Sequence, residues 1–204
     1  MQAGPIPLNA SGLSAGIFVR GLWNLDAMLV KAQAHAEAVG RDETTLLHAR
    51  LADATTVPAA SHDTRRDLHR FPLAAQAHWA AASARLAIQR LLGESAPPAP
   101  YEDAARFSNL RQHLGATILY LEGVPSHELD AGLDRTVTIQ HPRGATRASG
   151  SRFLLAFAIP HFHYHLVAAY SILRQEGVPL SMGDFLGQWG RSNASFEANR
   201  RKGE

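Results

Sequence analysis

Two histidines separated by four residues are the best candidates for chemistry in this chain. His161 and His165 lie inside its longest nearly uninterrupted apolar run, which extends from Phe153 to Val178. Residues four apart share one face of a helix, so both imidazoles would point the same way. Such a pair can bind Zn²⁺, Ni²⁺ or Fe²⁺ if another helix supplies a third ligand. The alternative is a pair of buried histidines hydrogen-bonded to neighbours such as Gln76 or Tyr170.

The other histidines are weaker candidates for ligands. His163 lies two residues from each of the pair and would face away on the same helix. His48 falls at the end of a predicted short helix, and His62 and His69 fall in a polar segment typical of an exposed loop. The chain has no cysteine, which excludes a disulfide, a thiol nucleophile and a cysteine-ligated zinc. It also lacks a G-x-S-x-G elbow, a P-loop and a G-x-G-x-x-G motif.

Composition narrows the class of protein. The 204 residues fit one domain, and 20 basic against 18 acidic residues give a net charge of +2, which is too balanced to indicate a nucleic-acid partner. No stretch of membrane-spanning length is free of charges or of several histidines, so we expect no membrane partner. The N-terminus lacks the basic start and apolar run of a signal peptide, so we expect a cytoplasmic protein.

Apolar periodicity predicts the elements that would position these histidines. Stripes at three- and four-residue spacing predict helices over Ala15–Val39 (capped by Ser14), Glu43–Ala49, Pro72–Gly93 and Tyr101–Glu122, and a last helix from Pro160 to Gly177. Before the last helix, Thr136–Gln140 alternates like a strand, and the residues after it have turn chemistry. We therefore predict a mainly α, up-and-down four-helix bundle with a short β-hairpin or extended excursion. Residues 1–190 would form this domain, with a loop insertion at about 53–70, and residues 191–204 a flexible tail.

Several sequence blocks resemble one known family. The segments FVRGLWNLDAMLVKAQAHAEA, FPLAAQ, RLLGESAPPAPYED, IPHFHYH with AAYSILRQEGV, and GDFLG follow one another between Phe18 and Leu186. They are similar to successive blocks of an uncharacterised bacterial family, a domain of unknown function within the DinB-like superfamily of four-helix bundles. The resemblance implies this fold. It also implies a three-histidine metal site, with two ligands from a late H-x-x-x-H matching His161 and His165. The early ligand should fall near Gln76, where this chain has glutamine, and His78 two residues later.

Two hypotheses follow. In the first, the bundle binds a small molecule in a pocket to which Gln76, Trp23 and Tyr170 contribute, without a metal. In the second, His161, His165 and His78 hold a divalent metal in an enzyme of the thiol-transferase or hydrolase type, as the resemblance implies. The alanine-rich helix that begins after Pro72 offers a surface for a homodimer.

Overall fold

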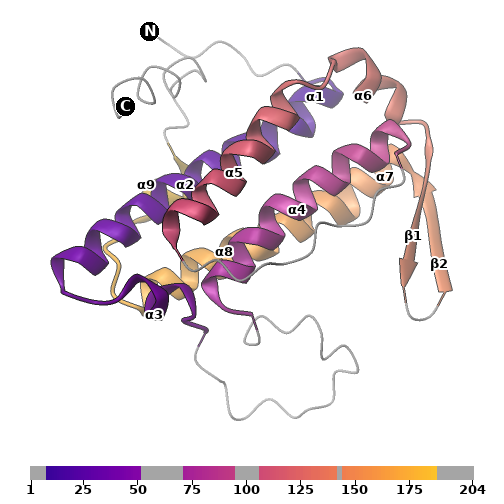
Figure 1. The fold of residues 1–204 in the computed structure, drawn as a ribbon. Coiled ribbons are helices and arrows are strands. Elements are labelled where there is room, and N and C mark those ends of the chain that lie inside the picture. The colour runs from indigo at the N-terminus through magenta and orange to yellow at the C-terminus, as the bar shows by residue number, and fades with distance from the viewer. Residues whose placement is uncertain (1–7, 52–70, 95–105, 142–143, 188–204) are drawn as a thin grey trace, which may run out of the picture.

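The computed structural model describes residues 8–51, 71–94, 106–141 and 144–187, and its long helices form a bundle with a hairpin at one end (Figure 1). The helices are α1 (Ala10–Leu13), α2 (Ala15–Ala38), α3 (Glu43–Leu47), α4 (Leu73–Leu92), α5 (Phe107–Glu122), α6 (Ser126–Gly132), α7 (Gly150–Phe153), the π-helical turn η2 (Leu154–Ala158), α8 (Ile159–Gln175) and α9 (Met182–Leu186). The mainly α bundle with a hairpin before the last long helix is confirmed. The predicted insertion at 53–70 and the tail at 191–204 lie outside the described residues.

Helix α2 forms where the first apolar stripe predicts it. Its buried residues include Phe18, Leu22, Leu25 and Leu29, which recur at steps of four and three. Ser14 precedes the helix but does not cap it with its side chain, because the hydroxyl donates to the carbonyl of Ala10 in α1 instead. The stripe therefore indicates the helix correctly, and only the role of Ser14 differs.

Helix α4 lies at the centre of the bundle. It packs against α2, α5 and α8, and every residue from Leu73 to His78 is buried. Its alanines leave room for these neighbours to approach closely on several sides. The alanines of this helix are all buried against its neighbours, and the homodimer expected from its composition stays a prediction.

A hairpin closes one end of the bundle. Strand β1 (Thr136–His141) pairs antiparallel with β2 (Gly144–Ser149), with Thr136 opposite Ser149. β2 occupies residues that the sequence assigns to a turn, because its small and polar side chains lack a strand's apolar alternation. Gly150 then approaches the carbonyl of Gly132 so closely that a Cβ would collide with it. This contact fixes where the last helix begins.

The last helix begins ten residues before the proline predicted to open it. α7, η2 and α8 follow one another without a break from Gly150 to Gln175. Within this run, the N–H of Ile159 bonds to the carbonyl of Leu154, five residues back, and the next residue is Pro160, which has no N–H to donate. The predicted stop is confirmed, since Gly177 has a positive φ of 85° just after the helix ends.

Two helical stretches, 10–38 and 150–175, are long and apolar enough to cross a membrane by length and composition alone. Both are core elements here. α2 packs against α8, and the rings of Phe18 and Phe162 meet edge to face with centroids 5.1 Å apart.

Candidate functional site

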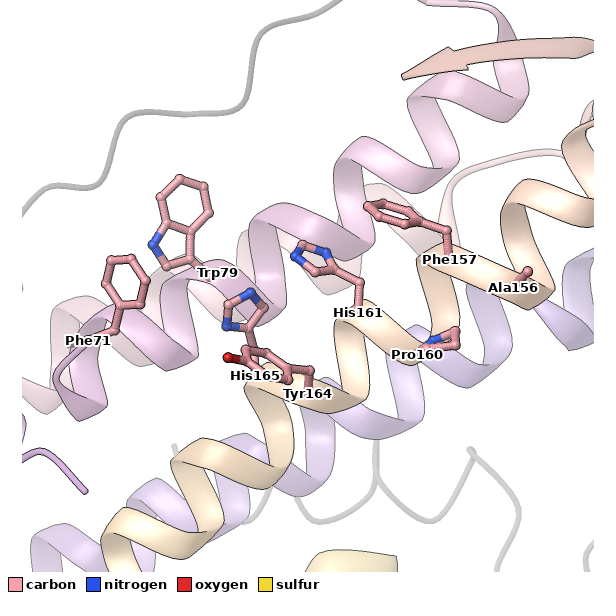
Figure 2. A pocket seen from close by; sticks show the side chains of 8 residues that line it. All are labelled: Phe71, Trp79, Ala156, Phe157, Pro160, His161, Tyr164 and His165. Carbon is pink, nitrogen blue, oxygen red and sulfur yellow. The ribbon is translucent and has the colours of Figure 1, made fainter. Parts of the chain in front are cut away.

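A pocket of about 570 Å³ lies between α4 and the segment formed by η2 and α8. Figure 2 shows its lining side chains, which are largely aromatic: Phe71, Trp79, Ala156, Phe157, Pro160, His161, Tyr164 and His165. Among the described residues, the lining includes no carboxylate, lysine or arginine. Aromatic walls with a few polar groups are typical of sites for small organic molecules.

His165 is held in one orientation by Gln76. Its Nδ1 lies 2.8 Å from Oε1 of Gln76, and the two residues are 6% and 0% exposed. A carboxamide oxygen only accepts hydrogen bonds, so Nδ1 donates its proton. In the neutral ring the acceptor lone pair is then on Nε2. The geometry matches the alternative of a buried histidine hydrogen-bonded to Gln76.

His161 joins His165 to a row of aromatic rings. The two imidazoles meet edge to face with centroids 4.9 Å apart, and Phe157 stacks on His161 at 5.3 Å. Figure 2 shows both imidazoles directed into the space between α4 and α8. The pair predicted from the four-residue spacing therefore comes together in the pocket.

His78 does not join this pair. Two residues beyond Gln76 on α4, it faces another direction, because successive helical residues are rotated by about 100°. Its ring stacks on His113 of α5 with centroids 5.0 Å apart. Within the described residues, no three histidine, aspartate or glutamate side chains are placed to hold a metal ion.

The sequence does not single out the cluster that contains His78. Burial lowers the pKa of His113, and the positive charge of Arg85 lowers it further. The guanidinium of Arg85 lies 3.9 Å from the ring centre of Tyr120, whose pKa is raised by burial and by the charge of Glu94. These groups come from α4 and α5, and only the pairing of the two helices reveals them.

Trp23 and Tyr170 do not line this pocket either. Trp23 lies on α2 and packs against the core. Tyr170 follows His165 by five residues, which turns it away from the pocket, and its ring meets Phe185 of α9 with centroids 5.3 Å apart. Both side chains therefore pack against other parts of the bundle and do not line the pocket as predicted.

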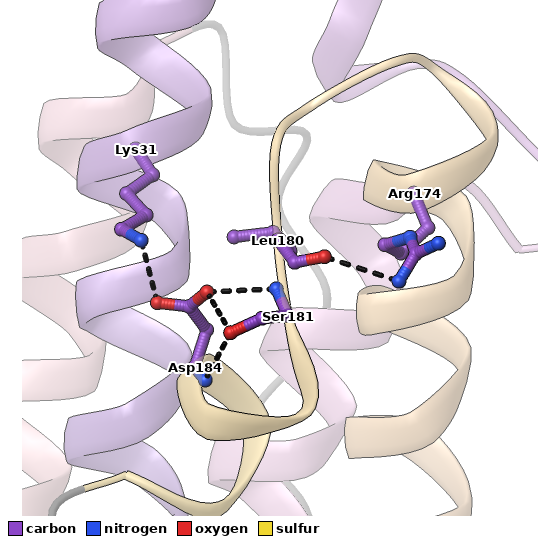
Figure 3. Close-up of polar contacts among 5 residues, drawn as sticks. All are labelled: Lys31, Arg174, Leu180, Ser181 and Asp184. Atoms are coloured by element: carbon purple, nitrogen blue, oxygen red, sulfur yellow. Dashed lines mark hydrogen bonds and ion pairs between the residues drawn. The ribbon is translucent and has the colours of Figure 1, made fainter.

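The contacts of α9 and the chain before it hold this segment against α2 and α8. Asp184 accepts from the backbone N–H and hydroxyl of Ser181 and forms an ion pair of 2.6 Å with Lys31 of α2 (Figure 3). Arg174 of α8 donates to the carbonyl of Leu180, 3.1 Å away. These bonds connect the chain after α8 to both helices.

Two of the weaker candidate histidines have local partners. Nδ1 of His163 lies 2.9 Å from the carbonyl of Ile159, and Nδ1 of His48 lies 2.8 Å from that of Thr44. Both are contacts one turn back on the same helix. His62 and His69 lie outside the described residues.

Sequence reasoning missed most of the pocket's walls. On η2 and α8, the walls come from two rows of residues with four-residue spacing. One row contains the histidines and consists of Phe157, His161 and His165, and the other consists of Ala156, Pro160 and Tyr164. This signal is visible in the sequence once the helix is known to begin before Pro160. The contributions of Phe71 and Trp79 depend on how α4 packs, and no local pattern indicates them.

Comparison with known proteins agrees with this architecture. Residues 12–186 match the model of a family described as a domain of unknown function, DUF1993. The chain is also similar to a DinB family member protein from Shewanella denitrificans, known from a crystal structure at 1.83 Å resolution. The TM-score is 0.73 at 29% sequence identity, over 89% of this chain and 93% of the other. Comparison with curated proteins gave no match. The chain therefore belongs to the DUF1993 family and is a DinB-like helical bundle.

Proposed function

We propose that this protein binds a small, mainly apolar organic molecule in the pocket between α4 and α8. The observation that carries the proposal is the lining itself: four aromatic side chains and two histidines surround about 570 Å³. Aromatic walls supply a large apolar contact area, while the imidazoles provide polar groups that orient a ligand. His165, fixed by Gln76, offers such a group without having to be ordered on binding.

A neutral fluorogenic probe, N-phenyl-1-naphthylamine, tests this proposal. Ala156 lies on the pocket wall and is exposed, so Ala156→Trp fills the pocket without disturbing the core. The matched control is Ala116→Trp, at an exposed position of α5 away from the pocket. We expect saturable binding to the natural protein and the control, and at least roughly tenfold weaker binding to Ala156→Trp. Equal affinity for all three proteins would show that the probe does not occupy this pocket.

A divalent-metal-dependent enzyme of the thiol-transferase or hydrolase type is the second candidate. It is favoured by one observation, the convergence of His161 and His165 in a pocket where Gln76 orients one imidazole. The described residues provide two imidazoles and no third protein ligand, so they do not fit the three-histidine set that the resemblance implies. Calorimetric titration with Zn²⁺, Ni²⁺ and Fe²⁺ decides between the candidates. One ion per chain, lost in His165→Ala, would favour the metal enzyme.

We also propose that the protein acts in the cytoplasm as a homodimer. The two stretches apolar enough for a membrane contain α2 and α8, which pack against each other in the bundle, and this supports a soluble protein. The contact between the two copies would use the exposed face of η2 and α8, where Leu155 and Val167 are 59% and 46% exposed.

A further inference from the structure

We infer that the preferred ligand is an organic carboxylate whose apolar body fills the aromatic pocket and whose anionic group binds Arg90. This inference rests on the proposed function and adds the chemical class of the ligand. It depends on a basic side chain of α4 that lies beyond the pocket lining.

Arg90 is connected to the pocket by stacked rings. Its guanidinium carbon lies 5.8 Å from the ring centre of Phe153, and the rings of Phe153 and Phe157 stack with centroids 5.9 Å apart. Phe157 is part of the pocket wall. The guanidinium is therefore about two ring spacings from the aromatic wall, a distance that a short alkyl chain can span.

Arg90 has no carboxylate partner within the described residues, although it is half-buried. The basic residues Lys31, Arg41 and Arg111, by contrast, form ion pairs with Asp184, Glu176 and Asp26. Burial lowers the pKa of Arg90, and no acidic neighbour among the described residues offsets this effect. A guanidinium in this state gains from an arriving carboxylate, which it can bind with two parallel hydrogen bonds.

The pocket itself does not oppose an anion. In the part of the chain that the structure describes, its lining contains no carboxylate that would repel one, and no lysine or arginine that would compete with Arg90 for it. Arg90 lies in the last turn of α4, where a positive charge also favours the helix dipole. The favourable interaction with the helix dipole explains a basic residue at this position, but it does not require the guanidinium to lie over the ring of Phe153.

A matched pair of compounds tests the inference: 6-phenylhexanoate and 6-phenylhexan-1-ol, each measured by displacement of N-phenyl-1-naphthylamine. The two differ in the terminal group, which is charged in the first and neutral in the second. Arg90→Gln removes the proposed anion site, Arg90→Lys keeps a point charge, and Arg152→Gln removes an exposed arginine of α7 as the control. Binding of the neutral probe to each variant reports whether its pocket is intact.

In the natural protein we expect the carboxylate to bind roughly ten- to a hundredfold tighter than the alcohol, as for a hydrogen bond to a charged group. Arg90→Gln should abolish this preference without changing the affinity for the neutral probe, Arg90→Lys should keep part of it, and Arg152→Gln should keep all of it. Equal affinity for both compounds in the natural protein, or a preference that survives in Arg90→Gln, would overturn the inference and leave the proposed function standing. Failure of the neutral probe to bind the natural protein would instead remove both.

Discussion

The hydrogen bond between His165 and Gln76 joins the pocket to the core, and its loss should be costly. We expect His165→Leu to lower the free energy of unfolding by about 1–3 kcal/mol, because the buried oxygen of Gln76 loses its imidazole donor. Gln76→Leu should cost a similar amount by depriving Nδ1 of its acceptor. Replacing both residues by leucine should cost less than the two changes added together.

Urea denaturation of the three variants and the natural protein, followed by circular dichroism, completes this double-mutant cycle. Additive costs, with no coupling between the two positions, would mean that the bond contributes nothing to stability. The neutral probe should still bind to Gln76→Leu if the pocket walls alone determine its affinity.

His113 should make the stability of the protein depend on pH. Burial and the charge of Arg85 lower its pKa in the folded state, so the unfolded chain binds the proton more readily. The resulting stability is fully present above the unfolded pKa of about 6.5 and is lost as the pH falls from there through the folded pKa. Protonation would also place a positive charge against His78 and near Arg85.

Urea unfolding at pH 7.5 and 5.5 measures this dependence. We expect His113→Phe, which keeps a ring to stack on His78, to reduce the loss of stability between the two pH values. His127→Phe, on α6 where the side chain is exposed, is the control and should keep the full loss. An unchanged loss in His113→Phe would assign the effect to another group.

Residue spacing predicted the central pair of the candidate site but not its surroundings. His161 and His165 lie four apart on one helix, so local geometry alone brings them together. The rotation of α4 turns Gln76 toward α8 and His78 toward α5. This rotation is set by the packing of the helices, which no local sequence pattern encodes. The resemblance placed an early ligand near Gln76, and the structure makes this glutamine the hydrogen-bond partner of His165.

At the scale of elements, the short helix α9 should depend on one carboxylate. Asp184 forms a capping box with Ser181 and an ion pair with Lys31, and Asn24 donates to the carbonyl of Phe185 beside them. Burial alone would raise the pKa of Asp184, but the hydrogen bonds from Lys31 and Ser181 outweigh it and lower the pKa. We expect Asp184→Ala to cost about 1 kcal/mol of unfolding free energy, mainly through the lost cap.

Lys31→Gln separates the cap from the ion pair. Because the side chain of Lys31 is 50% exposed, its loss should cost less than about 0.5 kcal/mol. Ser181→Ala should resemble Asp184→Ala, since it removes the other half of the box. Thermal unfolding of the three variants tests this order, and an equal cost for Lys31→Gln and Asp184→Ala would assign the effect to the ion pair.

The helices α2 and α4 and the short helix α3 were predictable, whereas α1, α6 and the start of the last long helix were not. The stripes of α2 and α4 give their bounds to within a residue or so, because each stripe reflects burial along several turns. Helices α1 and α6 are too short for a periodic pattern. A proline usually marks the start of a helix, yet here Pro160 follows a π-helical turn within a continuous helical run, which no local pattern indicates.

For the whole molecule, the distribution of charge indicates where a second copy would bind. The 21 residues from Phe153 to Leu173 include no charged side chain, although Leu155, Tyr164 and Val167 are exposed. A helix face in contact with water normally has charges, and two identical uncharged faces can pair around a twofold axis without burying one. Since the alanines of α4 are buried within the chain, the exposed face of η2 and α8 is where we expect the proposed homodimer to form.

Light scattering coupled to size-exclusion chromatography tests this interface. We expect the natural protein to elute as a dimer and Val167→Glu to elute as a monomer, because the twofold axis would bring two buried like charges close together. Val30→Glu is the matched control: Val30 on α2 is 42% exposed, close to the 46% of Val167, and lies on a different helix. It should leave the dimer intact. A monomer in the natural protein would exclude the homodimer, and a dimer that survives Val167→Glu would place the interface on another face of the bundle.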